Sequence, residues 1–148
     1  MSMEMFVLSD RRLASITEWQ QAIDREGFAM RLLTEATFDA LGGFLPVRYG
    51  DVEAGFECYH EDVAAIMDMC EDVDFGHRWK YALGLRFGGN LDALFGANAC
   101  GAAYAKATGG VFFDTEANEI LTAEKALRSA RDIEKDLPRL RAYLASPI

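Results

Sequence analysis

The sequence predicts one α+β domain, covering residues 1–148, with a mostly antiparallel sheet and helices packed mainly on one face. The length of 148 residues is that of a single ordinary domain. Helical and extended patterns are mixed along the chain, and several extended segments are joined by turns short enough for hairpins. With 51% hydrophobic and 26% charged residues, the chain can bury a core without a disulfide or metal.

The first elements follow from an apolar run and a capping box. Met5–Leu8 is a short apolar run that predicts a strand. Ser15 followed by Glu18 is typical of a helix start, with Ser15 as N-cap and Glu18 reaching back to it. Gly27 stands where a helix would end, and residues 28–33 predict a returning strand. Helical spacing in between is kept by Ile16, Trp19 and Ile23.

A hairpin and a short helix are predicted next. Residues 44–49 predict a strand that Pro46 restricts to a sheet edge, because proline cannot donate to a strand ladder. A turn at Gly50-Asp51 leads to a strand over residues 53–60. Asp62 can then cap a helix over residues 63–70.

Residues 78–87 give the clearest strand pattern. Large apolar side chains alternate with polar or small ones, which predicts a strand with one face on the core. The predicted core face consists of Trp79, Tyr81, Leu83, Leu85 and Phe87. Together with the preceding elements, the segment from residue 5 to residue 87 could form a ferredoxin-like βαββαβ unit.

Two helices complete the prediction. Asn90 can cap a helix to about residue 107 whose side chains are unusually small, so either close helix–sheet packing or a symmetric homodimer contact is expected. Asn98 lies on its apolar stripe and should bond a nearby backbone group or line a small pocket. A last helix begins near Thr122, and Pro138 should kink or restart it.

The net charge of −9 comes from one segment. Nine of the 24 acidic residues lie between Asp51 and Asp74, which contains no Lys or Arg, so the rest of the chain is neutral. This segment is either a solvated face or a docking surface that attracts a basic partner. A calcium loop is not expected, because the segment lacks the ligand spacing such loops use. The predicted partner-binding residues are Glu57, Glu61, Asp62, Asp68, Glu71, Asp72 and Asp74.

Two histidines and two cysteines offer an alternative. Cys58, His60, Cys70 and His77 are residue types that bind zinc, but their spacing matches no familiar zinc site. Core packing for the cysteines and local capping for the histidines is the favoured interpretation. The alternative function is a small-molecule or metal-dependent enzyme that uses His60, His77 and neighbouring carboxylates; no catalytic residue, metal or cofactor is assigned.

Several function classes are disfavoured by composition. An acidic chain lacks the excess of Lys and Arg that nucleic-acid binding needs. No apolar run is long enough to span a membrane, and the N-terminus does not resemble a signal peptide. Three cysteines cannot all pair within one chain, which favours a reducing cytoplasm.

The stretch L-S-D-R-R-L-A-S-I-T-E-W-Q-Q-A-I-D-R-E-G-F, with the later G-F-L-P-V and G-F-E, resembles a family of small bacterial proteins. The resemblance covers most of the chain and implies no catalytic residues. In size, acidity and α+β order the chain is also similar to immunity proteins that neutralise bacterial toxins. The sequence therefore favours a non-enzymatic interaction protein with a basic partner.

Overall fold

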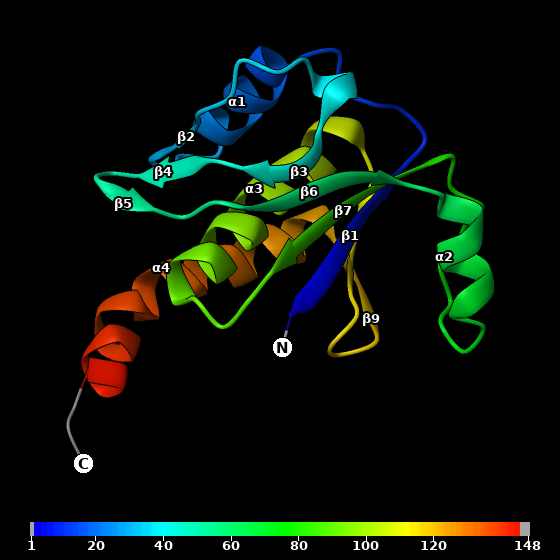
Figure 1. The fold of residues 1–148 in the computed structure, drawn as a ribbon. Coiled ribbons are helices and arrows are strands. Elements are labelled where there is room, and N and C mark those ends of the chain that lie inside the picture. The colour runs from blue at the N-terminus through cyan, green and yellow to red at the C-terminus, as the bar shows by residue number, and fades with distance from the viewer. Residues whose placement is uncertain (1, 146–148) are drawn as a thin grey trace.

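The computed structural model describes residues 2–145 as two antiparallel sheets with helices on both sides (Figure 1). The larger sheet has the strand order β3 (Gly42–Leu45), β6 (Phe56–Glu61), β7 (Tyr81–Phe87), β1 (Met3–Ser9), β8 (Val111–Asp114) and β9 (Glu119–Thr122). The smaller has the order β2 (Met30–Leu32), β4 (Val47–Tyr49) and β5 (Val52–Glu53). The helices are α1 (Ile16–Arg25), α2 (Val63–Met69), α3 (Leu91–Thr108) and α4 (Ala123–Ala145), with a 3₁₀ turn at Phe38–Ala40. The predicted α+β class with a mostly antiparallel sheet is confirmed.

The ferredoxin-like unit is not confirmed. In such a unit each helix connects two parallel strands of the same sheet that lie one strand apart. Here α1 instead leads from β1 of the larger sheet to β2 of the smaller one, and β1 lies between β7 and β8. The helix α2 joins two antiparallel neighbours, β6 and β7, so it replaces a hairpin turn rather than crossing the sheet.

The two sheets are joined by a bent hairpin. The sequence predicts one strand over residues 44–49 and one over 53–60, but each is split between the sheets, at Pro46 and at Ala54-Gly55. Pro46 has no N–H to continue the ladder, while the Ala54 N–H donates to the Val47 carbonyl across the bend. Both arms of the hairpin therefore pass from the smaller sheet into the larger one.

Helix α3 is the centre of the main core, and its small side chains permit close packing. A Cβ on Gly96 would lie 2.1 Å from the Ala54 carbonyl oxygen, and one on Gly101 would lie 2.6 Å from Leu85 Cδ1. This confirms close packing on strands of the same chain as the reason for the small residues, so a homodimer contact is not needed to explain them. Asn98 donates to the Leu94 carbonyl at 2.7 Å, the local bond that the sequence predicts.

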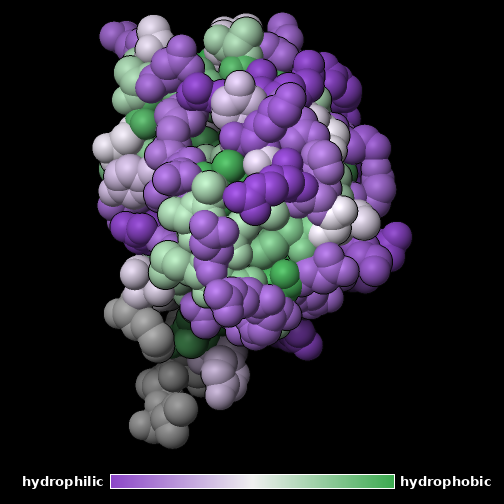
Figure 2. All heavy atoms as spheres, turned by 90° about the vertical axis from the view of Figure 1, so that its right-hand side faces the viewer, coloured by the Kyte–Doolittle hydropathy of each residue, from purple (hydrophilic) through white to green (hydrophobic). Residues whose placement is uncertain are grey.

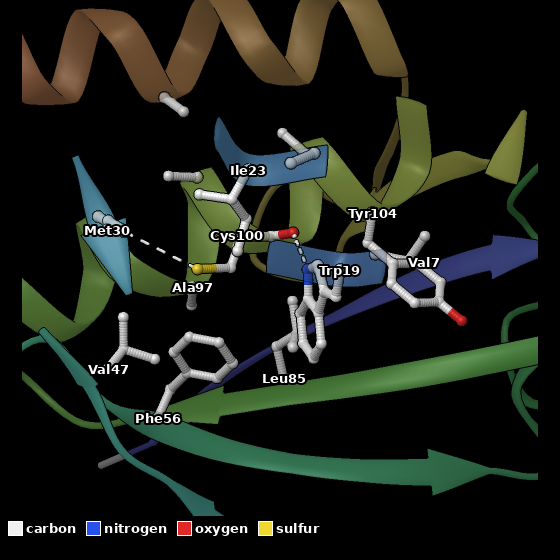
Figure 3. Close-up of a cluster of buried hydrophobic side chains, with 14 of the residues drawn as sticks. Val7, Trp19, Ile23, Met30, Val47, Phe56, Leu85, Ala97, Cys100 and Tyr104 are labelled. Atoms are coloured by element: carbon white, nitrogen blue, oxygen red, sulfur yellow. Dashed lines mark hydrogen bonds between the residues drawn. The ribbon is translucent and has the colours of Figure 1, made fainter. Parts of the chain in front are cut away.

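Aromatic residues fill the space between α1, α3 and the sheet. Figure 3 shows the Trp19 indole donating to the Cys100 carbonyl, at 3.0 Å. The same view shows the Cys100 thiol directed at the Met30 sulfur, 3.8 Å away. Trp19 and Cys100 are fully buried, so these contacts fix α1 and β2 against α3.

The larger sheet is covered on both faces, which differs from the prediction for residues 78–87. Helices α1, α3 and α4 lie on the main core face, as predicted. On the other face Phe6, Leu8, Ala82 and Phe113 form a second buried cluster under α2. Trp79 precedes β7 and packs on this second cluster, not beside Leu83, because the chain turns before it enters the strand.

The predicted helix starts are confirmed, with two differences of detail. The Ser15 hydroxyl accepts from the Glu18 N–H, but the Glu18 carboxylate accepts from the Ala14 N–H and not from that of Ser15. Asn90 caps α3 through the N–H groups of Asp92 and Ala93. Helix α4 runs through Pro138 as one continuous element, so of the two predicted alternatives, a kink or a restart, the restart is wrong.

Candidate functional site

Helix α2 is an apolar helix on the molecular surface. Asp62 begins it by accepting from the Ala64 and Ala65 N–H groups. Six of its seven residues are apolar, yet none is fully buried, and the Met69 side chain is 85% exposed. Val63, Ile66 and Met67 pack in part on the second buried cluster, while Ala64, Ala65 and Met69 are exposed. The exposed apolar side chains mark a surface suited to contact with another molecule.

The acidic residues of the predicted docking segment surround this helix. Asp62 caps its first turn, and Asp68 is exposed on the helix itself. Beyond its end, Asp72 accepts from the Asn118 amide, and Asp74 accepts from the Gly76 N–H in a turn. The structure describes no hydrogen bond or ion pair of the Asp68, Glu61 or Glu71 carboxylates with residues 2–145. We call α2 together with Glu61, Glu71, Asp72 and Asp74 the α2 surface.

A groove runs between α2 and the second face of the larger sheet. It has a volume of about 300 Å³. Figure 2 looks onto this side of the molecule, where hydrophobic residues gather in the middle of a largely hydrophilic surface. The groove therefore offers an apolar floor with charged groups at its sides. It is lined by Glu4, Phe6, Glu61, Asp62, Ala65, Ile66, Met69, Cys70, Arg86 and Thr115.

Arg86 is the basic residue that lines this groove, and it is held by acids. Its guanidinium forms an ion pair with Glu4 and lies 5.3 Å from the centre of the Tyr59 ring. The hydrogen bond and charge of Glu4 raise the pKa of Arg86, so the guanidinium is held more firmly in its charged form. Glu57 lies opposite Arg86 in the β6–β7 register and accepts from the Tyr59 hydroxyl at 2.5 Å.

The predicted residues are thus brought together in part. Six of them lie on or beside α2: Glu61, Asp62, Asp68, Glu71, Asp72 and Asp74. Glu57 does not, because it lies on β6 opposite Arg86 of β7. Glu61 covers Gly84, whose missing Cβ would lie 2.9 Å from the Glu61 carboxylate. Sequence reasoning missed Glu4 and Arg86, because only the antiparallel register of β1 and β7 places them side by side.

The two histidines are separate and serve local contacts. His60 Nε2 lies 2.8 Å from the Phe38 carbonyl and therefore donates to it, while the ring also contacts Arg12 Nη2 at 3.1 Å. His77 Nε2 lies 2.6 Å from Asp10 Oδ2 at the surface. Across residues 2–145, no three His, Cys, Asp or Glu side chains come close enough to hold a metal ion.

The cysteines of the same segment differ in environment. Cys58 is fully buried on the main core face, and burial raises the pKa of its thiol to about 12. Cys70 lies on the opposite side of the sheet, at the end of α2, and burial followed by the charge of Asp72 raises its pKa. A thiol that stays protonated at neutral pH is a poor nucleophile, so neither cysteine has the setting of a catalytic residue.

None of the helices within residues 2–145 combines the length and apolarity that crossing a membrane requires. Comparisons of the chain with protein-family models, with curated proteins and with solved structures found no match.

Proposed function

We propose that the protein is a non-enzymatic interaction module and that the α2 surface docks a basic protein partner. The observation that carries the proposal is the exposed side of an apolar helix, with Met69 85% exposed, surrounded by carboxylates. Protein interfaces commonly have an apolar centre and a polar rim, and this surface has both. A role of this kind fits immunity proteins that neutralise bacterial toxins, where the toxin would be the basic partner.

The chemistry of the partner follows from the charges. Because six acidic residues lie on or beside α2, a complementary surface should carry Lys and Arg around an apolar side chain. The groove beside α2 has room for such an apolar side chain, and Met69 at its edge can contact the same group. Attraction between the charges would speed association and make it sensitive to salt.

The test is capture of a partner from cell lysate, followed by affinity measurements with two matched double variants. Asp68→Asn with Glu71→Gln removes two charges from the α2 surface. Glu35→Gln with Asp132→Asn removes two exposed charges elsewhere. We expect the first pair to weaken binding by about tenfold and the second by less than about twofold, since short-range charge complementarity dominates.

A second arm tests the apolar centre. Met69→Ser should also weaken binding, whereas Leu144→Ser, at a side chain 65% exposed on α4, should not. The proposal is overturned if no partner is captured, if binding is insensitive to salt, or if the two members of either matched set behave alike.

A further inference from the structure

A second, smaller cavity, separate from the groove beside α2, lies where strands β1, β6 and β7 meet. Its volume is about 110 Å³, enough for a group of a few heavy atoms. Most of its polar lining comes from Ser9, Arg12, His60, Tyr81 and Tyr104. Glu61 also borders it, but the Glu61 carboxylate is directed over Gly84 on the opposite face of the sheet.

Arg12 brings unused hydrogen-bond donors to this cavity. Its Nη2 atom makes both of the polar contacts described, to Asp39 Oδ1 at 3.1 Å and to the His60 ring. Within residues 2–145, Nε and Nη1 have no acceptor, which leaves three N–H groups free. The guanidinium is held in place by the rings of Phe38 and Tyr81, 5.7 and 5.6 Å from its central carbon.

Tyr104 supplies a buried donor to the same cavity. Its side chain is only 2% exposed, and its oxygen accepts from the Leu13 N–H at 3.4 Å. Its own O–H finds no acceptor in the part of the chain that the structure describes. Burial raises the pKa of Tyr104 to about 12, with the backbone bond and the charges of Arg12 and Arg11 acting the other way, so the hydroxyl keeps its proton at neutral pH.

The geometry points to a binding site for a small oxyanion group, a carboxylate or a phosphate, in which Arg12 and Tyr104 are the donors. A guanidinium and a hydroxyl are the groups that proteins use to bind such oxygens. His60 fixes the position of Arg12, because its Nε2 proton is engaged by Phe38 and its Nδ1 can accept from Nη2. This site is separate from the α2 surface and does not depend on the proposed docking function.

The test is an NMR titration of the full chain with acetate and, separately, with inorganic phosphate. We expect saturable shifts of the Leu13 and Leu83 amides, with a dissociation constant on the order of 1 mM for at least one anion. Saturation by acetate alone assigns the site to a carboxylate, and saturation by phosphate alone assigns it to a phosphate group. Absence of a saturable shift with both anions overturns the proposal.

Matched variants separate a built site from general attraction of anions. Arg12→Gln should weaken binding by about tenfold or more, because it removes charge-assisted bonds. Arg11→Gln removes the same charge one residue away, where the side chain bonds the Ala107 carbonyl, and should weaken binding by less than about twofold. Tyr104→Phe keeps the ring that stacks on Phe38 but should weaken binding severalfold. Equal effects of the two arginine variants, or no effect of Tyr104→Phe, would contradict the site.

Discussion

Single glycines set the closest backbone approaches in this protein. At Gly96 in α3, an added Cβ would lie 2.1 Å from the Ala54 carbonyl oxygen and 3.2 Å from the Ala54 Cβ. Ala54 occupies the bend of the hairpin that joins the two sheets, so the helix touches the hairpin backbone directly. The absence of a side chain at this one position thus determines how closely the smaller sheet can approach the core.

Gly96→Ala should therefore destabilise the protein, although alanine favours helix more than glycine does by about 1 kcal/mol. The backbone atom it meets cannot move aside as a flexible side chain can, so we expect a net loss of about 2 kcal/mol in the free energy of unfolding. Urea denaturation measures it. Gly89→Ala, where an added Cβ meets nothing within 4 Å, is the control and should change stability by less than about 1 kcal/mol. Equal stability of the two variants would show that the contact is not tight.

At the scale of elements, one hydrogen bond joins the smaller sheet to the last helix. The Tyr49 hydroxyl of β4 donates to the Glu134 carboxylate of α4 at 2.9 Å. Burial, followed by the bond to Glu134 and its charge, raises the pKa of Tyr49 above its ordinary value of 10.0. Folding therefore favours the protonated phenol.

Tyr49→Phe removes this bond and should lower the free energy of unfolding by about 1 kcal/mol at neutral pH. The expected loss is modest because a hydrogen bond that is partly exposed to solvent contributes less than a buried one. A group whose pKa is raised by folding stabilises the folded state fully at pH values below its ordinary pKa. This stabilisation is lost as the pH rises through the pKa of the folded state. The wild type should thus lose more stability than the variant above about pH 10. Denaturation at neutral and alkaline pH compares them. Parallel pH profiles would mean that Tyr49 does not contribute to the alkaline transition.

Local patterns along the chain account for most elements but not for how they meet. Capping at Ser15, Asp62 and Asn90 is a short-range effect, so the helix starts were predictable from neighbouring residues. The division of the hairpin between two sheets was not predictable in this way. Proline breaks the ladder at Pro46, but the sheet that each half joins depends on its partner strand, β2 for β4 and β6 for β3. The candidate site shows the same limit. Its acids were visible as a charge run, whereas the exposure of α2 and the Glu4–Arg86 pair depend on the sheet order.

For the whole molecule, the two faces of the larger sheet are unequal. The main face is covered by α1, α3 and α4, which share one large buried cluster. The second face has a small cluster of buried residues, and α2 covers it without burying any of its own residues fully. Most of the acids responsible for the net charge of −9 lie on this thinly covered side, where like charges on and beside α2 repel one another. Asp51 and Glu53 are the exceptions, because they lie in the hairpin of the smaller sheet.

This inequality predicts an order of local opening. Strands β1 and β7 lie in the middle of the sheet with buried residues on both faces, so their amides should exchange hydrogen only through global unfolding. The amides of α2 should exchange through a local opening that costs several kcal/mol less, because few buried apolar contacts are lost when it detaches. Native-state hydrogen exchange measured across a denaturant series gives both free energies. Higher salt should slow exchange in α2 by screening the acids around it, while β1 and β7 serve as the internal reference. Equal protection of α2 and β1 would show that the helix is an integral part of the core, and the α2 surface would then be a rigid face of the domain.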